Sequence, residues 1–149
     1  MDFHLDTLLN LPDVSVFTCY RQEGSTFLDL HFLNPKVKCK YCKYSTDNIH
    51  QERPILVRDL SICGQAVYLK VSRRQIYCPF CKKYSTESLD FVEQGRNYTK
   101  RYEDYIYERV KELTVEQVSY HEQLSAEQVK NIFSRMANRK KKTGQCLKN

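Results

Sequence analysis

The chain has 149 residues, of which 41% are hydrophobic and 28% charged, so it is able to fold as one domain or as two very small ones. No apolar run approaches the roughly 18 residues of a membrane-spanning helix, and the N-terminus is not a basic segment followed by an apolar core. These absences argue against a membrane or secreted protein, and we expect a cytoplasmic one. Its thiols then stay reduced, so paired cysteines indicate metal or redox chemistry more readily than disulfides.

The charge of the chain is unevenly placed. Residues 1–35 contain one basic residue, Arg21, and five acidic ones, which gives this segment a net charge of −4. Since the whole chain carries +6, residues 36–149 carry +10. A basic body behind an acidic leader indicates a polyanionic partner, although ordinary solubility charge gives the same excess.

Residues 1–35 are predicted to form an acidic N-terminal leader. The run from Leu8 to Leu11 predicts a short helix that ends before Pro12, because a residue that precedes proline disfavours the helical conformation. Apolar residues then alternate up to Phe32 as they do in strands. These patterns assign the leader no function.

Two Cys-x-x-Cys pairs, Cys39-Lys-Tyr-Cys42 and Cys78-Pro-Phe-Cys81, are the most constrained pattern in the first two thirds of the chain. Four thiolates in two such pairs are the ligand set of a tetrahedral zinc ion, and a dication is needed to offset their mutual repulsion. We therefore predict a structural Zn²⁺ held by Cys39, Cys42, Cys78 and Cys81, since four sulfur ligands leave no position for a reacting water. Two unrelated pairs, or a redox dithiol, are the alternatives.

A hairpin pattern lies between the two cysteine pairs. Residues 55–60 and 66–71 are predicted strands, and Gly64 marks the turn. A hairpin returns the chain to its starting point, which lets residues far apart in sequence meet at one metal. We assign residues 36–95 to a zinc-ribbon domain.

From residue 96 the apolar pattern changes to helical periodicity, with Tyr102, Ile106 and Val110 on one helix face. Two capping boxes follow, Thr114-Val-Glu-Gln117 and Ser125-Ala-Glu-Gln128, and each marks a helix start. The predicted elements are helices at about 98–112, 115–122 and 126–138, which form a helix-turn-helix domain over 96–138, and a basic disordered tail at 139–149.

The last of these helices has two unlike faces, one apolar and one polar and basic. The second helix of a helix-turn-helix packs one face on the bundle and presents the other to base edges and phosphates. Asparagine suits adenine, and lysine and arginine suit guanine or phosphate. The candidate DNA-binding residues of this segment are Gln128, Lys130, Asn131, Ser134, Arg135, Arg139, Lys140, Lys141 and Lys142.

Two positions depart from the usual helix-turn-helix pattern. Glu122 stands where an apolar residue is usual and Gln123 where glycine is usual, which puts the turn geometry in question. The alternative is a bundle whose polar face is only solvated. DNA binding is favoured, because the basic excess and the basic tail agree with it.

Basic residues also flank the second cysteine pair. Arg73 and Arg74 precede it, and Lys82 and Lys83 follow it, with aromatic residues interleaved. This arrangement predicts either a rim that contacts phosphates, with Arg73 and Arg74 as further candidate DNA-binding residues, or a solvated edge.

The order of these motifs resembles the N-terminal part of ISL3-family transposases. The matching motifs, which span about residues 36–138, are Arg58-Asp-Leu60, Gly64, Val67-Tyr-Leu69, Arg73-Arg74 and Cys78-Pro-Phe-Cys81, followed by a helix-turn-helix. The resemblance implies a zinc-binding ribbon and a helix-turn-helix that together bind the terminal inverted repeats of the element. Residues 1–35 fit a short leader of the kind those proteins carry.

Full-length members of that family continue into a large RNase H-like catalytic domain. The acidic residues after residue 96 all lie in the predicted helices or at their edges, whereas a two-metal site needs carboxylates that converge from a folded scaffold. We therefore expect no enzymatic activity and no catalytic residues. The expected function is that of the DNA-binding module of a truncated, split or stand-alone transposase.

The predicted fold class is α+β, with a small four-cysteine zinc ribbon and β-hairpin followed by a three-helix helix-turn-helix bundle. The predicted partners are double-stranded DNA and either a catalytic transposase subunit or a second copy of the chain, and no membrane. The expected location is the cytoplasm, at the nucleoid when the protein is bound to DNA. Two other functions stay open: a protein-interaction or regulatory adaptor with a structural zinc site, and a dithiol redox protein.

Overall fold

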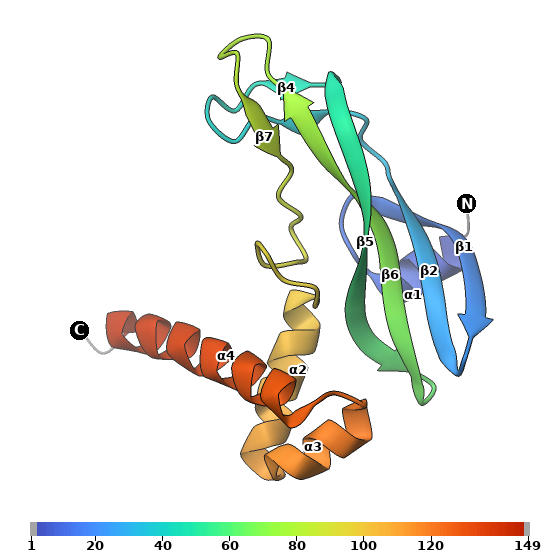
Figure 1. Ribbon diagram of the computed structural model, residues 1–149, viewed down its shortest axis with the longest axis vertical. Helices are drawn as coiled ribbons and strands as arrows, with labels where there is room; N and C mark the ends of the chain where they lie inside the picture. The colour runs from blue at the N-terminus through green and yellow to red at the C-terminus, as the bar shows by residue number, and fades with distance from the viewer. Residues whose placement is uncertain (1–2, 148–149) are drawn as a thin grey trace. The chain divides into compact units, whose positions relative to one another are not determined.

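The computed structural model describes residues 3–147 of a mixed α+β chain that divides into two compact units, Met1–Tyr98 and Thr99–Asn149 (Figure 1). The elements of the first unit are α1 (Phe3–Leu9), β1 (Val14–Gln22), β2 (Ser25–Phe32), β3 (Val37–Lys38), β4 (Ser45–Thr46), β5 (Ile49–Ile62), β6 (Gln65–Tyr77) and β7 (Tyr84–Thr86). The elements of the second unit are α2 (Lys100–Glu112), α3 (Val115–Glu122) and α4 (Ala126–Leu147).

A five-stranded sheet organises the first unit. Its strands lie in the order β1-β2-β6-β5, and β7 pairs with β6. The β2 and β6 strands run parallel, whereas the other neighbours are antiparallel. The short strands β3 and β4 form a separate two-stranded sheet next to the first cysteine pair.

The hairpin predicted between the cysteine pairs is confirmed, and it is longer than expected. The antiparallel pairing of β5 and β6 runs from Ile49 opposite Ile76 to Ile62 opposite Gln65. The two turn residues, Cys63 and Gly64, both have positive φ, at 52° and 74°. Such turns match the right-handed twist of paired strands, which is why glycine is favoured there.

The predicted separation of an acidic leader from the ribbon domain differs from the structure. Residues 14–32 form β1 and β2, which belong to the same sheet as the hairpin. Leu28 and Leu30 on β2 are buried in one core with Val67 and Leu69 on β6. The leader is therefore part of the first unit, because its alternating apolar residues fill the core that β6 alone leaves open.

All three helices of the second unit contribute buried apolar side chains. Thr99 caps the start of the α2 helix, and its hydroxyl accepts a hydrogen bond from the Tyr102 amide. Thr114 forms the predicted capping box at the start of α3, and Ser125 and Gln128 exchange the same two bonds at the start of α4. The fully buried side chains of the unit include Tyr102, Ile106, Val118, Val129 and Ile132.

The predicted disordered tail at 139–149 is helical as far as the structure describes it. The α4 helix continues to Leu147, and residues 148–149 lie outside the described part of the chain. Arginine and lysine are good helix formers, and Lys140 is paired with Asp104 of α2 at 3.2 Å. No helix within residues 3–147 combines the length and the apolar character that crossing a membrane would require.

Candidate metal centre and candidate nucleic-acid interface

The four predicted ligands come together at one end of the β5–β6 hairpin. The Sγ atoms of Cys39, Cys42, Cys78 and Cys81 all lie within 4.8 Å of one another. The Cys39–Cys81 separation is 3.6 Å, and the Cys42–Cys78 separation is 3.5 Å. Zn–S bonds of about 2.3 Å in a tetrahedron place sulfur atoms roughly 3.8 Å apart, so the four side chains fit a zinc ion.

The two cysteine pairs adopt the same local turn. The Cys39 amide donates to the Tyr44 carbonyl at 2.7 Å, and the Cys78 amide donates to the Lys83 carbonyl at 2.9 Å. The residue after each second cysteine, Lys43 or Lys82, has positive φ and donates back to the carbonyl of the first cysteine. In each turn the amide of the second cysteine also donates to the sulfur of the first, as a negatively charged metal–thiolate group requires.

Amide hydrogen bonds and burial affect the pKa values of the four thiols in opposite directions. The Cys42 amide lowers the pKa of Cys39 to about 6, and the Cys81 amide likewise lowers the pKa of Cys78. Burial, followed by the neighbouring thiols, raises the pKa of Cys81 to about 12. Four ionised sulfur atoms are thus not stable together on their own, and a dication is the group that offsets their repulsion.

Arg74, a predicted DNA contact, is buried and anchors the ribbon. Its guanidinium pairs with Glu87 through Nε–Oε1 and Nη2–Oε2 contacts of 2.9 and 2.6 Å. It also donates to the Asn34 carbonyl at 3.1 Å and lies 4.0 Å from the centre of the Phe32 ring. Three of its N–H groups are thus engaged inside the fold, its side chain is 7% exposed, and the neighbouring Arg73 is half-buried.

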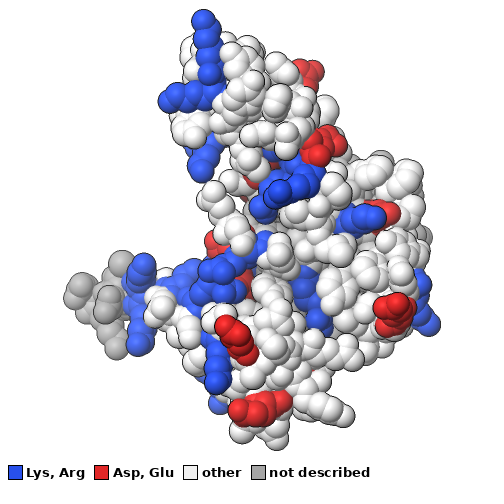
Figure 2. All heavy atoms as spheres, viewed as in Figure 1, with Lys and Arg blue, Asp and Glu red and all other residues white. Residues whose placement is uncertain are grey.

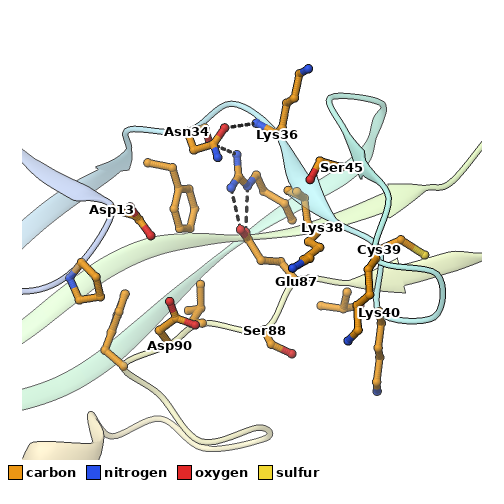
Figure 3. A pocket seen from close by; sticks show the side chains of 18 residues that line it. Asp13, Asn34, Lys36, Lys38, Cys39, Lys40, Ser45, Glu87, Ser88 and Asp90 are labelled. Atoms are coloured by element: carbon orange, nitrogen blue, oxygen red, sulfur yellow. Dashed lines mark hydrogen bonds and ion pairs between the residues drawn. The ribbon is translucent and has the colours of Figure 1, made fainter.

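A pocket of about 610 Å³ lies beside this anchor (Figure 3). The side chains of Asp13 and Asp90 lie at one end, and Lys38 and Lys40 lie at the other. Lys36 and Lys43 complete a set of four lysines in its lining. These lysines are not among the DNA-binding residues predicted from the sequence, although they alternate with other residues around the first cysteine pair.

The unusual residues at the turn between α3 and α4 have a structural explanation. Gln123 adopts the left-handed conformation, with φ 57° and ψ 41°, in which glycine is usual. The Leu124 amide donates to the Ser119 carbonyl, and the Ser119 hydroxyl donates to the Leu124 carbonyl. These bonds close the turn without glycine.

Glu122, which stands where an apolar residue is usual, is buried and accepts a hydrogen bond of 2.9 Å from the Tyr102 hydroxyl. Replacing Tyr102 with phenylalanine should lower the free energy of unfolding by about 1–3 kcal/mol, because a buried carboxylate loses a donor. Thermal or urea unfolding measures this change, with the half-exposed Tyr105→Phe as the matched control. Equal stability of the two variants would show that the bond contributes nothing.

The predicted recognition face of α4 is mostly accessible. Lys130, Asn131 and Ser134 are exposed, as are residues 138–142 beyond them. Figure 2 shows lysine and arginine side chains gathered over α4. The Gln128 side chain caps the helix start by accepting from the Ser125 amide, and Lys140 pairs with Asp104.

Arg135 is the exception on this face. Its Nη2 atom lies 2.9 Å from Oε2 of Glu103, whose side chain is only 3% exposed. The predicted base contact is therefore engaged in an ion pair that joins α4 to α2. The helical pattern did not reveal this, because Glu103 is 32 residues away in sequence.

Comparison with protein families gives two matches. Residues 35–81 match the zinc-finger of transposase IS204/IS1001/IS1096/IS1165, and residues 87–137 match the helix-turn-helix domain of transposase family ISL3. Neither the curated proteins nor the solved structures gave a match. The first match includes all four clustered cysteines, which hold structural zinc, and the second includes α2, α3 and the first half of α4. Residues 35–81 therefore form an ISL3-family zinc ribbon, and residues 87–137 form an ISL3-family helix-turn-helix.

Proposed function

We propose that the chain is a DNA-binding transposase module that recognises the terminal inverted repeats of its element, with α4 as the recognition helix. The observation that carries this proposal is the division of α4 into a buried and an exposed face. Val129, Ile132 and Met136 are buried in the helical unit, whereas Lys130 and Asn131 face solvent. A helix seated in this way is able to enter the major groove without exposing its apolar residues.

The exposed residues have distinct roles in this proposal. Asn131 is suited to the N6 and N7 groups of adenine, and Lys130 to guanine or phosphate. Ser134, one helical turn along, contacts a base or the backbone. Residues 139–142 add attraction to phosphate that does not depend on sequence and weakens as salt rises.

In this proposal the zinc site and the carboxylates of the helical unit have structural roles. Zinc holds the ribbon, and the buried or paired carboxylates of the helical unit, Glu103, Glu122 and Asp104, serve structural contacts. We propose that strand transfer is supplied by a catalytic transposase subunit or domain, and that the chain acts in the cytoplasm at the nucleoid. A second copy of the chain is the natural partner on paired inverted repeats, since symmetric sites favour symmetric binders.

Lys130→Glu and Asn131→Ala should separate affinity from specificity. Lys130→Glu should weaken binding to every duplex by roughly 10-fold and reduce the dependence of log K on log salt by about 1, because one phosphate contact is lost. Asn131→Ala should cost about 1–3 kcal/mol on duplexes from the element ends and little on random duplexes. Fluorescence anisotropy titrations at several salt concentrations measure both effects.

Lys111→Glu is the matched control, because Lys111 is an exposed lysine of the same helical unit. It should leave binding close to that of the original chain. If Lys130→Glu and Asn131→Ala bind element ends with unchanged affinity, α4 is not the recognition helix. Absence of any DNA binding at low salt, with firm binding to a protein, would instead identify an adaptor.

A further inference from the structure

The turns that hold the zinc site expose large aromatic side chains. We define the ribbon tip as residues 40–44 and 79–84, the two segments that surround the second cysteine of each pair. Tyr41 is 56% exposed, Tyr44 48% and Phe80 75%. Tyr84, at the end of the second segment, is 51% exposed. Aromatic rings of this size are normally buried, so four exposed rings on two adjoining turns mark a binding surface.

Apart from the zinc-binding cysteines, the charged side chains in and beside these turns are all basic. Residues 36–46 and 78–84 contain no acidic residue. The basic residues of these two segments are Lys36, Lys38, Lys40, Lys43, Lys82 and Lys83. A zinc ion with four thiolates carries a charge of about −2, which six lysines outweigh. The surface is therefore complementary to a polyanion, and Lys40 and Lys43 continue it into the pocket beside the zinc site.

Contacts between the two turns hold the rings in place. Tyr44 of the first turn stacks on Phe80 of the second, with ring centres 6.0 Å apart and planes 17° from parallel. The ammonium group of Lys83 lies 4.9 Å from the centre of the Tyr41 ring. Tyr44 covers one face of the Phe80 ring. Because Phe80 is 75% exposed, its other face is open to solvent. The rings are thus ordered before any partner binds, which lowers the entropic cost of binding.

We propose that the ribbon tip binds unpaired DNA, with bases stacked on Phe80 and Tyr44 and phosphates on the surrounding lysines. In an intact duplex the faces of the bases are covered by their neighbours, whereas in a single strand they are free to stack on aromatic rings. The ribbon tip offers both groups that such a strand uses, open rings and a basic surround. This proposal rests on the proposed DNA-binding function, and it adds a second surface with a different substrate from that of α4.

The test compares two probes on the full zinc-loaded chain. One probe is an oligothymidylate of about 15 nucleotides, a length suited to single-strand sites, and the other is a duplex of similar length. Tyr44→Ala/Phe80→Ala should weaken oligothymidylate binding roughly 10-fold or more and leave duplex binding unchanged. The matched control is Phe17→Ala, because Phe17 is another exposed phenylalanine of the same unit. Zinc content and unfolding temperature are measured for every variant.

A lysine variant gives an independent readout. Lys82→Gln/Lys83→Gln should reduce the slope of log K against log salt for the oligothymidylate by about 1.4, since each phosphate contact on a single strand contributes about 0.7. The control, Lys70→Gln, removes an exposed lysine from β6 and should leave the slope unchanged. If Tyr44→Ala/Phe80→Ala loses its zinc, the comparison of Lys82→Gln/Lys83→Gln with Lys70→Gln still tests the proposal.

Three outcomes would overturn the proposal: no oligothymidylate binding by the original chain, no loss in either tip variant, or the same loss in the controls. The proposals for α4 and for the ribbon tip are tested independently. Lys130→Glu should weaken duplex binding alone, so an unchanged duplex affinity in that variant counts against the recognition helix and not against the ribbon tip.

Discussion

Replacing Cys78 with serine is expected to unfold the zinc ribbon. Around the metal site the buried apolar cluster consists of Val37, Cys39, Ile76 and Cys78, so few apolar side chains hold this end of the hairpin. Structural zinc contributes about 10–16 kcal/mol in small zinc domains, as much as the whole stability of a typical protein. Amide hydrogen exchange should show lost protection at residues 37–49 and 76–86, with protection kept in the separate core around Val67 and Leu69.

Removal of zinc by a chelator should give the same pattern. Acidification should also release the metal, because zinc binds thiolates and protons compete for them. Cys19→Ser is the matched control, since Cys19 is an exposed cysteine far from the cluster in sequence, and it should change neither zinc content nor protection. A metal-free chain that keeps the Cys39 and Cys78 amides protected would contradict a structural role for zinc.

Replacing Arg135 with alanine is expected to destabilise the helical unit by about 3 kcal/mol. The change leaves the carboxylate of Glu103 in a site where it is 3% exposed, and a buried charge without its partner costs about 3–5 kcal/mol. The partial exposure of Arg135, at 27%, places the expected loss at the lower end of that range. Urea unfolding followed by circular dichroism measures it.

Glu103→Gln/Arg135→Met should recover most of this loss, because the double variant leaves no buried charge. Lys140→Ala is the control, since it breaks an exposed ion pair with Asp104 that is worth less than about 1 kcal/mol. If Arg135→Ala were as stable as Lys140→Ala, the pair would be only a surface contact. The expected instability also means that lost DNA binding in an Arg135 variant does not identify a base contact.

Local sequence patterns predicted the structure correctly where it depends on residues close together in the chain. Two Cys-x-x-Cys pairs around a hairpin predicted the cluster that the structure contains, because turn and strand patterns act over a few residues. The capping boxes at Thr114 and Ser125 marked the starts of α3 and α4. The exposed face of α4 followed from helical periodicity, and its role in DNA binding stays a prediction.

Contacts between distant segments were the ones that the sequence did not reveal. The parallel pairing of β2 with β6 joins Phe27 to Tyr68, and no spacing rule predicts such a pair. Arg74 and Arg135 are residues of a type that often contacts DNA. In the fold, however, Arg74 forms an ion pair with Glu87, and Arg135 forms one with Glu103. The helix over residues 139–147 was missed because basic runs are helical only where the fold extends them.

The sequence by itself therefore determined the zinc ligands, the hairpin, the starts of α3 and α4 and the family. These depend on turns, periods and ligand spacings that a few consecutive residues carry. Only the tertiary structure decided which of the basic residues form ion pairs inside the fold. The sequence does not distinguish an arginine beside a buried carboxylate from an arginine in solvent. Their electrostatic interactions differ because of the charges that the fold places nearby.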